Sequence, residues 1–330
     1  MIELFGMPFM QRALIAAVLS GLIAPAIGTF IVQRRMSLLG DGLGHVAIMG
    51  VGLAMLTGWA PLPVAAVVCI AGAVIVELLR QNGKASGDLG LAILFYGGLA
   101  SGVLMAGMAG QGAGGLSSYL FGSLTSVSEQ DILVIVALAV VILLFTIGLA
   151  PRLLAVTVDE AYAQVLGIRV RWLNLLIVVL AAVTVTVSMR TVGLLLVSAL
   201  MVIPVSAAQQ SFVGFYASFF GAMGIGVLAA IGGTVGSFYL DSATGATIVV
   251  TAIGLLGVSW LVGGKLRRED RFIPFIEDHG VHQHEPAEAH ADPVHDPHRA
   301  EKLRIQHGDH IDYVHDGHRH AVHGDHYDEH

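Results

Sequence analysis

The sequence predicts an all-α, polytopic membrane protein with eight or nine transmembrane helices and a His-rich C-terminal tail. Of its 330 residues, 55% are hydrophobic and 12% are charged, and the mean hydropathy is +0.77. Soluble domains carry about twice that share of charged residues. Apolar runs of roughly 20 residues recur along the chain, which is the length that crosses a bilayer. This composition indicates a lipid bilayer rather than a nucleic acid as the partner.

Two regions of different composition divide the chain. Residues 1–266 form the predicted transmembrane domain, whereas residues 267–330 contain 15 acidic and 7 basic side chains. The tail has too little apolar content for a core, so we expect disorder in the absence of metal. Cys69 is the lone cysteine. It therefore excludes an intrachain disulfide and is expected to be a small buried hydrophobe.

The transmembrane domain contains a series of apolar runs separated by short polar or Gly/Pro-rich segments. We expect spans at 13–32, 37–56, 64–79, 89–108, 132–149, 172–208 (split into two at Arg190), 212–238 and 246–262. Residues 110–130 are polar and Gly/Ser-rich, which predicts a loop with or without a short helix. Pro204 lies inside an apolar run, where proline kinks or breaks a membrane helix.

Basic residues give the expected orientation. Those near the ends of the runs fall on one side if each run crosses once: Arg34, Arg35, Arg80, Lys84, Arg152, Arg169, Arg171, Lys265, Arg267 and Arg268. Because cytoplasmic loops carry an excess of Lys and Arg, the tail is predicted to be cytoplasmic and the N-terminus external.

Asp41 and His45 are an ionisable pair inside the second apolar run. In a helix, residues four apart lie on one face, one turn from each other. We expect them near the middle of the bilayer, where ionisable groups are costly and mostly line polar pathways. Carboxylate and imidazole together suit a divalent transition metal. The alternative interpretation is a buried pair that only packs helices.

A short helix is predicted at 158–167, within the longest polar segment of the transmembrane domain. Asp159 and Glu160 would begin it, and Gly167 lies near its end, as helix start and stop preferences require. Such a helix between two spans is either a docking element for a peripheral protein or an ordinary connector.

Two longer motifs resemble a known family. The stretches Arg34–His45 (Arg-Arg-Met-Ser-x-x-Gly-Asp-x-x-x-His) and Gly193–Pro204 resemble the permease subunit of ATP-binding-cassette importers for zinc and manganese. The resemblance implies that Asp41 and His45 contact the metal in transit. It also implies that Asp159–Gly167, including Glu160 and Ala161, is the coupling helix that meets a separate ATPase. A homodimer and an extracellular metal-binding protein are further implications.

Histidines dominate the tail: 14 of the 15 in the chain lie from His279 onward, interleaved with Asp and Glu. The recurring short spacings involve His279, His282, His284, His315, His318, His320, His323 and His326. Imidazole and carboxylate suit zinc, nickel or copper. The alternative is a polar extension without specificity.

The leading hypothesis is therefore a permease that imports a divalent metal across the plasma or inner membrane, zinc first and manganese second. No Gly-x-x-x-x-Gly-Lys-Ser/Thr motif is present, so ATP hydrolysis would reside on another chain, and no permanent cofactor is expected. A stand-alone carrier driven by an ion gradient is the alternative. An intramembrane metalloprotease would need His-Glu-x-x-His, which the sequence lacks.

Overall fold

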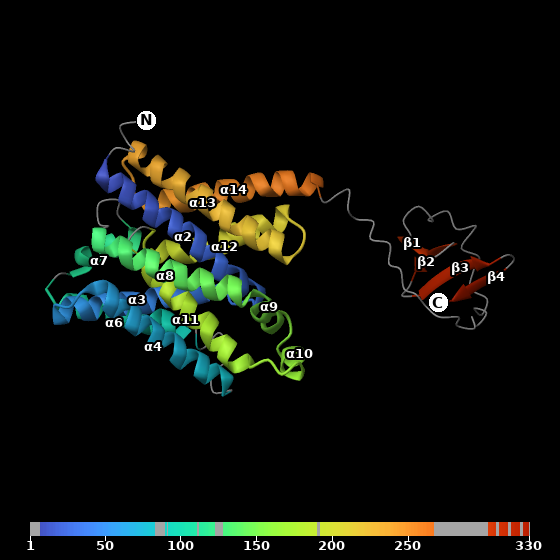
Figure 1. Ribbon diagram of the computed structural model, residues 1–330, viewed down its shortest axis with the longest axis horizontal. Helices are drawn as coiled ribbons and strands as arrows, with labels where there is room; N and C mark the ends of the chain where they lie inside the picture. Colours follow the sequence, from blue (N-terminus) through green and yellow to red (C-terminus); the bar gives the residue numbers. More distant parts are fainter. Residues whose placement is uncertain are drawn as a thin grey trace. The chain divides into compact units, whose positions relative to one another are not determined.

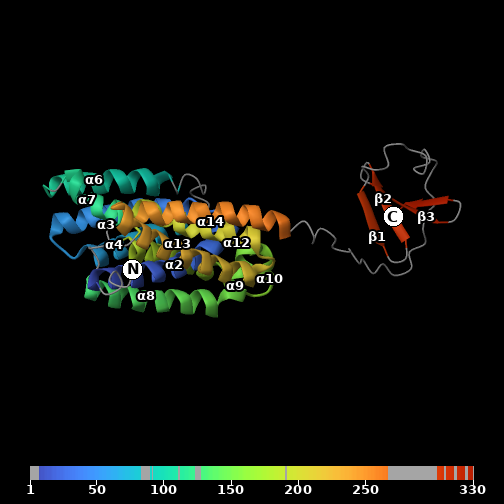
Figure 2. The same ribbon diagram turned by 90° about the horizontal axis from the view of Figure 1, so that it is seen from above.

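The computed structural model describes residues 7–82, 90, 92–110, 112–122, 128–189, 192–266 and four short segments between 303 and 329. The chain divides into two compact units, Met1–Gly264 and Lys265–His330. Helices make up the first unit, in which long helices run roughly alongside one another (Figures 1 and 2). The second unit contributes strands.

Apolar sequence accounts for most of the helices. In chain order they are α2 (Pro8–Gln33), α3 (Leu39–Thr57), α4 (Pro61–Gln81), the π-helix η1 (Ile93–Gly97), α6 (Gly98–Met108), α7 (Gly112–Phe121), α8 (Glu129–Gly148), α9 (Ala150–Val158), α10 (Glu160–Val165), α11 (Val170–Ser188), α12 (Leu194–Ser211), α13 (Phe215–Leu240) and α14 (Thr244–Leu266).

Seven of the described helices are long and apolar enough to cross a membrane, and two shorter apolar helices lie at Ile93–Met108 and Leu196–Ser211. The expected count of eight or nine spans is therefore not confirmed. The long run from 172 to 208 is divided as expected, because α11 ends at Ser188 and α12 begins at Leu194. Arg190 lies outside the described residues.

Helices α2 and α3 are the most buried of the seven, and α4, α8 and α14 are among the least buried. Glycines permit close packing at the centre, since a Cβ at Gly21 of α2 would lie 2.6 Å from the carbonyl oxygen of Gly226 in α13. Small residues serve this purpose in membrane helices. The peripheral helices expose large apolar side chains such as Leu133 and Leu144 of α8, as a lipid-facing surface requires.

Pro204 does not break its helix: α12 continues from Leu194 to Ser211 with the proline inside it. Pro25 lies inside α2 in the same way, and the Thr29 hydroxyl donates a 2.9 Å hydrogen bond to the Pro25 carbonyl. Hydroxyl side chains and neighbouring helices commonly make prolines tolerable in membrane helices.

The tail contains a four-stranded antiparallel sheet of order β1-β2-β3-β4, so the expectation of disorder does not hold for these segments. The strands are β1 (Leu303–His307), β2 (His310–His315), β3 (His318–His323) and β4 (His326–Glu329). Apolar or aromatic residues recur within them, and the pairs Gly308–Asp309, Asp316–Gly317 and Gly324–Asp325 separate them in the sequence. Such pairs are the residues that two-residue hairpin loops favour.

Candidate ion pathway and coupling site

Asp41 and His45 lie on one helix, four residues apart, as predicted. Helix α3 begins at Leu39, so Asp41 is in its first turn and His45 follows one turn later. The pair consequently lies between the arginine-rich end of α3 and its midpoint, and not at the middle. Residues 34, 35, 37 and 38 lie in turns between α2 and α3, and the depth of the pair in a bilayer stays a prediction.

The imidazole of His45 is buried, with 4% of the residue exposed. Its Nδ1 lies 3.0 Å from the backbone carbonyl oxygen of Asp41. A carbonyl oxygen can only accept, so Nδ1 carries the proton and donates it. With the proton on Nδ1, it is Nε2 that could offer a lone pair to a metal.

An aromatic ring packs against one face of the His45 imidazole. Phe95, in the π-helix η1, stacks on His45 with ring centroids 3.9 Å apart and an interplanar angle of 23°. The next helix approaches closely, because a Cβ at Gly98 would lie 2.7 Å from the backbone of His45. Single-turn π segments are frequent at functional sites, and here the segment places Phe95 against a candidate ligand.

The second sequence motif packs against the first. A Cβ at Gly40 would lie 3.3 Å from Ser198, and one at Gly44 would lie 2.9 Å from the carbonyl oxygen of Leu194. Gly40 and Gly44 flank Asp41 on α3, while Leu194 and Ser198 belong to α12. The two stretches that carried the family resemblance are therefore in contact.

Within the part of the chain whose side chains are described, no group of three or more His, Cys, Asp or Glu residues could enclose a metal ion. Cys69 is buried, as expected, and its thiol contacts the Leu43 carbonyl oxygen at 3.4 Å. Asp41 and His45 are therefore a pair of ionisable side chains rather than part of a closed ligand set among the described residues.

A cluster of charges joins α10 to the ends of three long helices. Glu160 Oε1 accepts hydrogen bonds from Arg34 Nη2 at 2.9 Å and from Asn174 Nδ2 at 3.1 Å. Arg80 Nη2 lies 3.9 Å from the same oxygen and 2.8 Å from Glu77 Oε1. We call Arg34, Glu77, Arg80, Glu160 and Asn174 the charge cluster. Arg34, directly after α2, and Arg80 of α4 thus meet at one end of the bundle.

One arginine of this cluster, Arg34, is buried and therefore depends on its acidic neighbours. The side chain of Arg34 is 5% exposed and that of Glu160 is 44% exposed. Burial lowers the pKa of Arg34 from its usual range, and the neighbouring carboxylates of Glu77 and Glu160 oppose that change. An arginine placed there without an acidic partner would be a buried uncompensated charge, which is strongly unfavourable.

The short helix α10 forms as predicted. Asp159 is its N-cap, with Oδ1 accepting from the Tyr162 amide at 2.9 Å. Gly167 has a φ of +74°, and the Gly167 and Ile168 amides donate to the carbonyls of Gln164 and Ala163. This is the left-handed termination that glycine favours. Ala161 lies within the helix, and Tyr162 and Val165 are exposed apolar residues on it.

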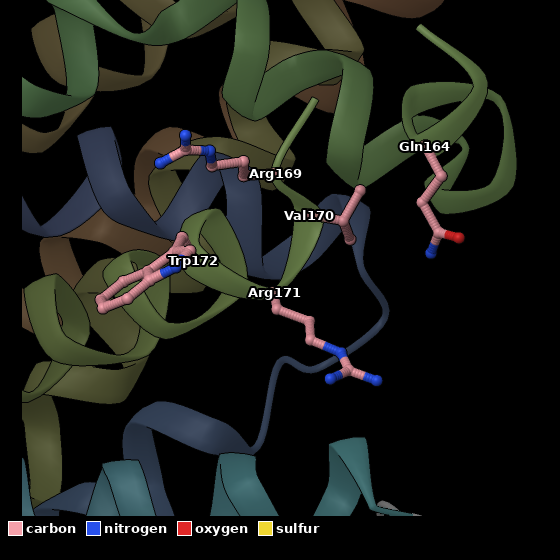
Figure 3. Close-up of a pocket in the computed structure, with 5 residues that line it drawn as sticks. All are labelled: Gln164, Arg169, Val170, Arg171 and Trp172. Carbon is pink, nitrogen blue, oxygen red and sulfur yellow. The ribbon is translucent and has the colours of Figure 1, made fainter. Parts of the chain in front are cut away.

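A surface groove of about 460 Å³ lies beside α10, lined by Gln164, Arg169, Val170, Arg171 and Trp172. Figure 3 shows Arg169 and Trp172 to the left of Val170, Gln164 to its right and Arg171 below it. A neighbouring groove shares Arg169 and Trp172 with the first and is also lined by Arg152 and Gly167. Arginines and exposed aromatic or aliphatic groups therefore surround the short helix.

Sequence reasoning missed several of these residues. Arg34 was expected as a basic residue at the end of a span and as part of the Arg34–His45 motif, and no sequence signal pairs it with Glu160. Phe95, Gly98 and Asn174 also lacked a signal, because their roles depend on packing between helices. In the tail, His315, His318, His320, His323 and His326 lie in β2, β3 and β4. His279, His282 and His284 lie outside the described residues.

Comparisons with known proteins agree with this architecture. Residues 6–263 match the model of the ABC 3 transport family. The chain is 30% identical over 260 residues to the manganese import system permease protein ScaB of Streptococcus parasanguinis, covering 79% of this chain and 92% of the relative. It is 31% identical over 254 residues to the high-affinity zinc uptake system membrane protein ZnuB of Haemophilus influenzae, covering 75% and 95%.

A solved structure shows the same fold. The complex of PsaBC from Streptococcus pneumoniae with Fab contains a chain that matches with a TM-score of 0.73 at 27% identity, covering 82% of this chain and 98% of that one. The matched family region ends at residue 263, before the acidic tail begins. The chain therefore belongs to the ABC 3 transport family and is the permease subunit of a metal importer of the ATP-binding-cassette class.

Proposed function

We propose that this permease imports a divalent transition metal, zinc in preference to manganese, and that the ion passes Asp41 and His45. The observation that carries the proposal is the hydrogen bond from His45 Nδ1 to the Asp41 carbonyl, which leaves Nε2 as a ligand. Imidazole suits zinc better than manganese, for which oxygen ligands are preferred. The named relatives include both zinc and manganese systems.

Two side-chain ligands suit an ion in transit. A closed set of four would hold zinc as a structural ion, whereas conduction requires a site weak enough to release its ion. Water or backbone carbonyls would complete the coordination. Stacking on Phe95 keeps the imidazole in place during the exchange.

Helix α10 is proposed to couple the pathway to a separate ATPase. A force on α10 reaches α2 through the Arg34–Glu160 bridge and α11 through Asn174. Arg34 directly precedes the turn into α3, the helix that carries Asp41 and His45. A displacement of α10 would therefore also displace the start of α3. The exposed Tyr162 and Val165 and the adjoining grooves provide the docking surface.

The remaining assignments follow from this mechanism. A homodimer would present two coupling helices to a pair of ATPase subunits, and an extracellular metal-binding protein would deliver the ion. The permease would lie in the plasma or inner membrane, with α10 and the tail in the cytoplasm. There the tail histidines would bind arriving metal and buffer or sense it. No enzymatic activity is assigned to this chain.

A stand-alone carrier driven by an ion gradient is not favoured, because the family match and the short capped helix both indicate an ATPase partner. Zinc and manganese uptake by proteoliposomes containing the permease and its ATPase separates the two mechanisms. Uptake that needs ATP and survives a protonophore supports the proposal. Uptake by the permease alone, abolished by the protonophore, would replace it with the carrier.

A further inference from the structure

The groove that contains Arg152 lies where two long apolar helices end. It has a volume of about 600 Å³, and its lining includes Leu149, Arg152, Leu166, Arg169, Trp172 and Leu173. Leu149 directly follows α8 and Arg169 directly precedes α11, and both helices are long and apolar enough to cross a bilayer. This groove, which we call the arginine groove, therefore lies at the boundary between lipid and water.

Two arginines of the arginine groove carry positive charge without an acidic partner. Arg152 and Arg169 are exposed, and none of the described lining residues is acidic. Among the residues that the structure describes, neither arginine forms an ion pair with a carboxylate. The acidic residues of the adjacent segment have other partners, since Asp159 caps α10 and Glu160 belongs to the charge cluster. Two guanidinium groups are therefore available to an external anion.

Trp172 adds an amphipathic ring that is typical of a membrane interface. It is 70% exposed and follows Arg169 by three residues, a spacing that brings side chains together on one side of a helix. Figure 3 shows both side chains to the left of Val170. Tryptophan is enriched at the level of the lipid headgroups, and Leu144 of the adjoining helix α8 is exposed as a lipid-facing residue. The groove thus combines cationic groups with an apolar side towards the bilayer.

These features together match an anionic phospholipid. A guanidinium group binds the oxygens of a phosphate through paired hydrogen bonds, and basic residues beside a membrane span attract anionic lipids. The apolar residues Leu149 and Leu173 suit the glycerol region and the first carbons of the acyl chains. A zwitterionic headgroup carries an additional cation, which two nearby arginines disfavour.

We propose that the arginine groove binds the headgroup of an anionic phospholipid. Arg152 and Arg169 bind its phosphate, and Trp172 lies beside its glycerol region. This site goes beyond the proposed transport function and does not depend on which metal is carried. Because the groove adjoins α10, the bound lipid would form part of the surface that α10 presents to the ATPase.

The test uses the full-length permease with W59F/W260F, which leaves Trp172 as its lone tryptophan. The protein is reconstituted into phosphatidylcholine vesicles that contain increasing shares of brominated phosphatidylglycerol or brominated phosphatidylcholine. Bromine quenches tryptophan fluorescence at short range, so the quenching of Trp172 reports which lipid occupies the groove.

Three double variants are compared in this background. R152Q/R169Q removes both arginines of the groove, whereas R152K/R169K keeps their charge and guards against a loss of folding. R35Q/R171Q is the matched control, because it removes two exposed arginines that are not among the lining residues.

We expect half-maximal quenching to need roughly tenfold less brominated phosphatidylglycerol than brominated phosphatidylcholine, as two basic side chains at a membrane surface imply. R152Q/R169Q should reduce this preference at least about fivefold. R35Q/R171Q should change it less than about twofold, and R152K/R169K should retain most of it. Equal quenching by the two lipids before the arginines are replaced would overturn the proposal. Equal losses in R152Q/R169Q and R35Q/R171Q would overturn it as well.

Two further measurements distinguish other occupants of the groove. Inorganic phosphate at millimolar concentration should not relieve the quenching by brominated phosphatidylglycerol, and relief would reassign the groove to a soluble phosphate compound. Co-purification of the ATPase is measured with the same variants. If R152Q/R169Q keeps the lipid preference but loses the ATPase, the two arginines bind an acidic surface of the ATPase and the lipid site is wrong.

Discussion

The Arg34 guanidinium donates to the Glu160 carboxylate at 2.9 Å, although 126 residues separate the two in the chain. The bridge joins the residue that directly follows α2 to the first residue of α10. Arg35 is the natural control, because it is adjacent and carries the same charge, and it is exposed. Any difference between variants of the two arginines reports on the bridge rather than on net charge.

R34A should weaken ATPase binding by about tenfold, equivalent to ~1.4 kcal/mol, and should lower metal uptake with it. The reason is that α10 loses its principal tether to α2. R35A should leave both properties within twofold. Co-purification of the ATPase and uptake in proteoliposomes give the two measurements. Equal behaviour of R34A and R35A would show that the bridge does not transmit coupling.

Gly98 is predicted to be intolerant of a side chain. A methyl group there would lie 2.7 Å from backbone atoms of His45, whereas one at Gly97 would meet nothing within 4 Å. Overpacking of this kind costs about 1–3 kcal/mol. G98A should therefore lower the thermal unfolding midpoint and metal uptake, and G97A should lower neither. A G98A variant as stable and active as G97A would contradict the described approach of α6 to α3.

Coupling is predicted to depend on the helical conformation of α10 as well as on the Arg34–Glu160 ion pair. G167A places a side chain at a φ of +74°, which costs about 1 kcal/mol, and E160Q removes the charge that faces Arg34. The combined E160Q/G167A variant should still insert in the membrane but should uncouple ATP hydrolysis from uptake. G148A, a glycine with open space around it, is the control. Wild-type ATPase yield with the combined variant would argue against α10 as the coupling helix.

Removing residues 279–330 should leave transport largely intact but change its response to metal level. The transmembrane domain supplies the pathway, and the family match ends at residue 263. Zinc binding by the full chain should also weaken below about pH 6, because protonated imidazole has no lone pair for the metal. Uptake across a series of zinc concentrations, with and without the tail, is the measurement. Identical response curves would remove any regulatory role for the tail.

Sequence reasoning predicted the helices well because bilayer thickness imposes a long apolar run on each span. It also predicted that Asp41 and His45 share a face, since that depends only on the helical period of 3.6 residues. It could not predict Phe95 against His45 or Arg34 against Glu160. Those contacts depend on how separate helices pack, which no local pattern encodes.

The tail shows the opposite case, in which a local turn signal and the overall composition point to different outcomes. Low apolar content argued for disorder, yet Gly-Asp or Asp-Gly pairs recur every eight residues at Gly308, Asp316 and Gly324. Such pairs between short strands are a strong hairpin signal. The turn chemistry therefore outweighed the composition argument.

The central claim is that the ion passes Asp41 and His45, and ATP-driven zinc uptake by D41A and H45A tests it most directly. T57A is the control on the same helix, since the Thr57 hydroxyl donates to the Leu53 and Ala54 carbonyls of that helix. Permease abundance and ATPase binding are measured alongside, because loss of a buried group can destabilise the protein. The account predicts that D41A and H45A bind the ATPase normally but fall to the uptake seen without ATP, while T57A transports like the wild type. Wild-type uptake in both D41A and H45A would contradict it.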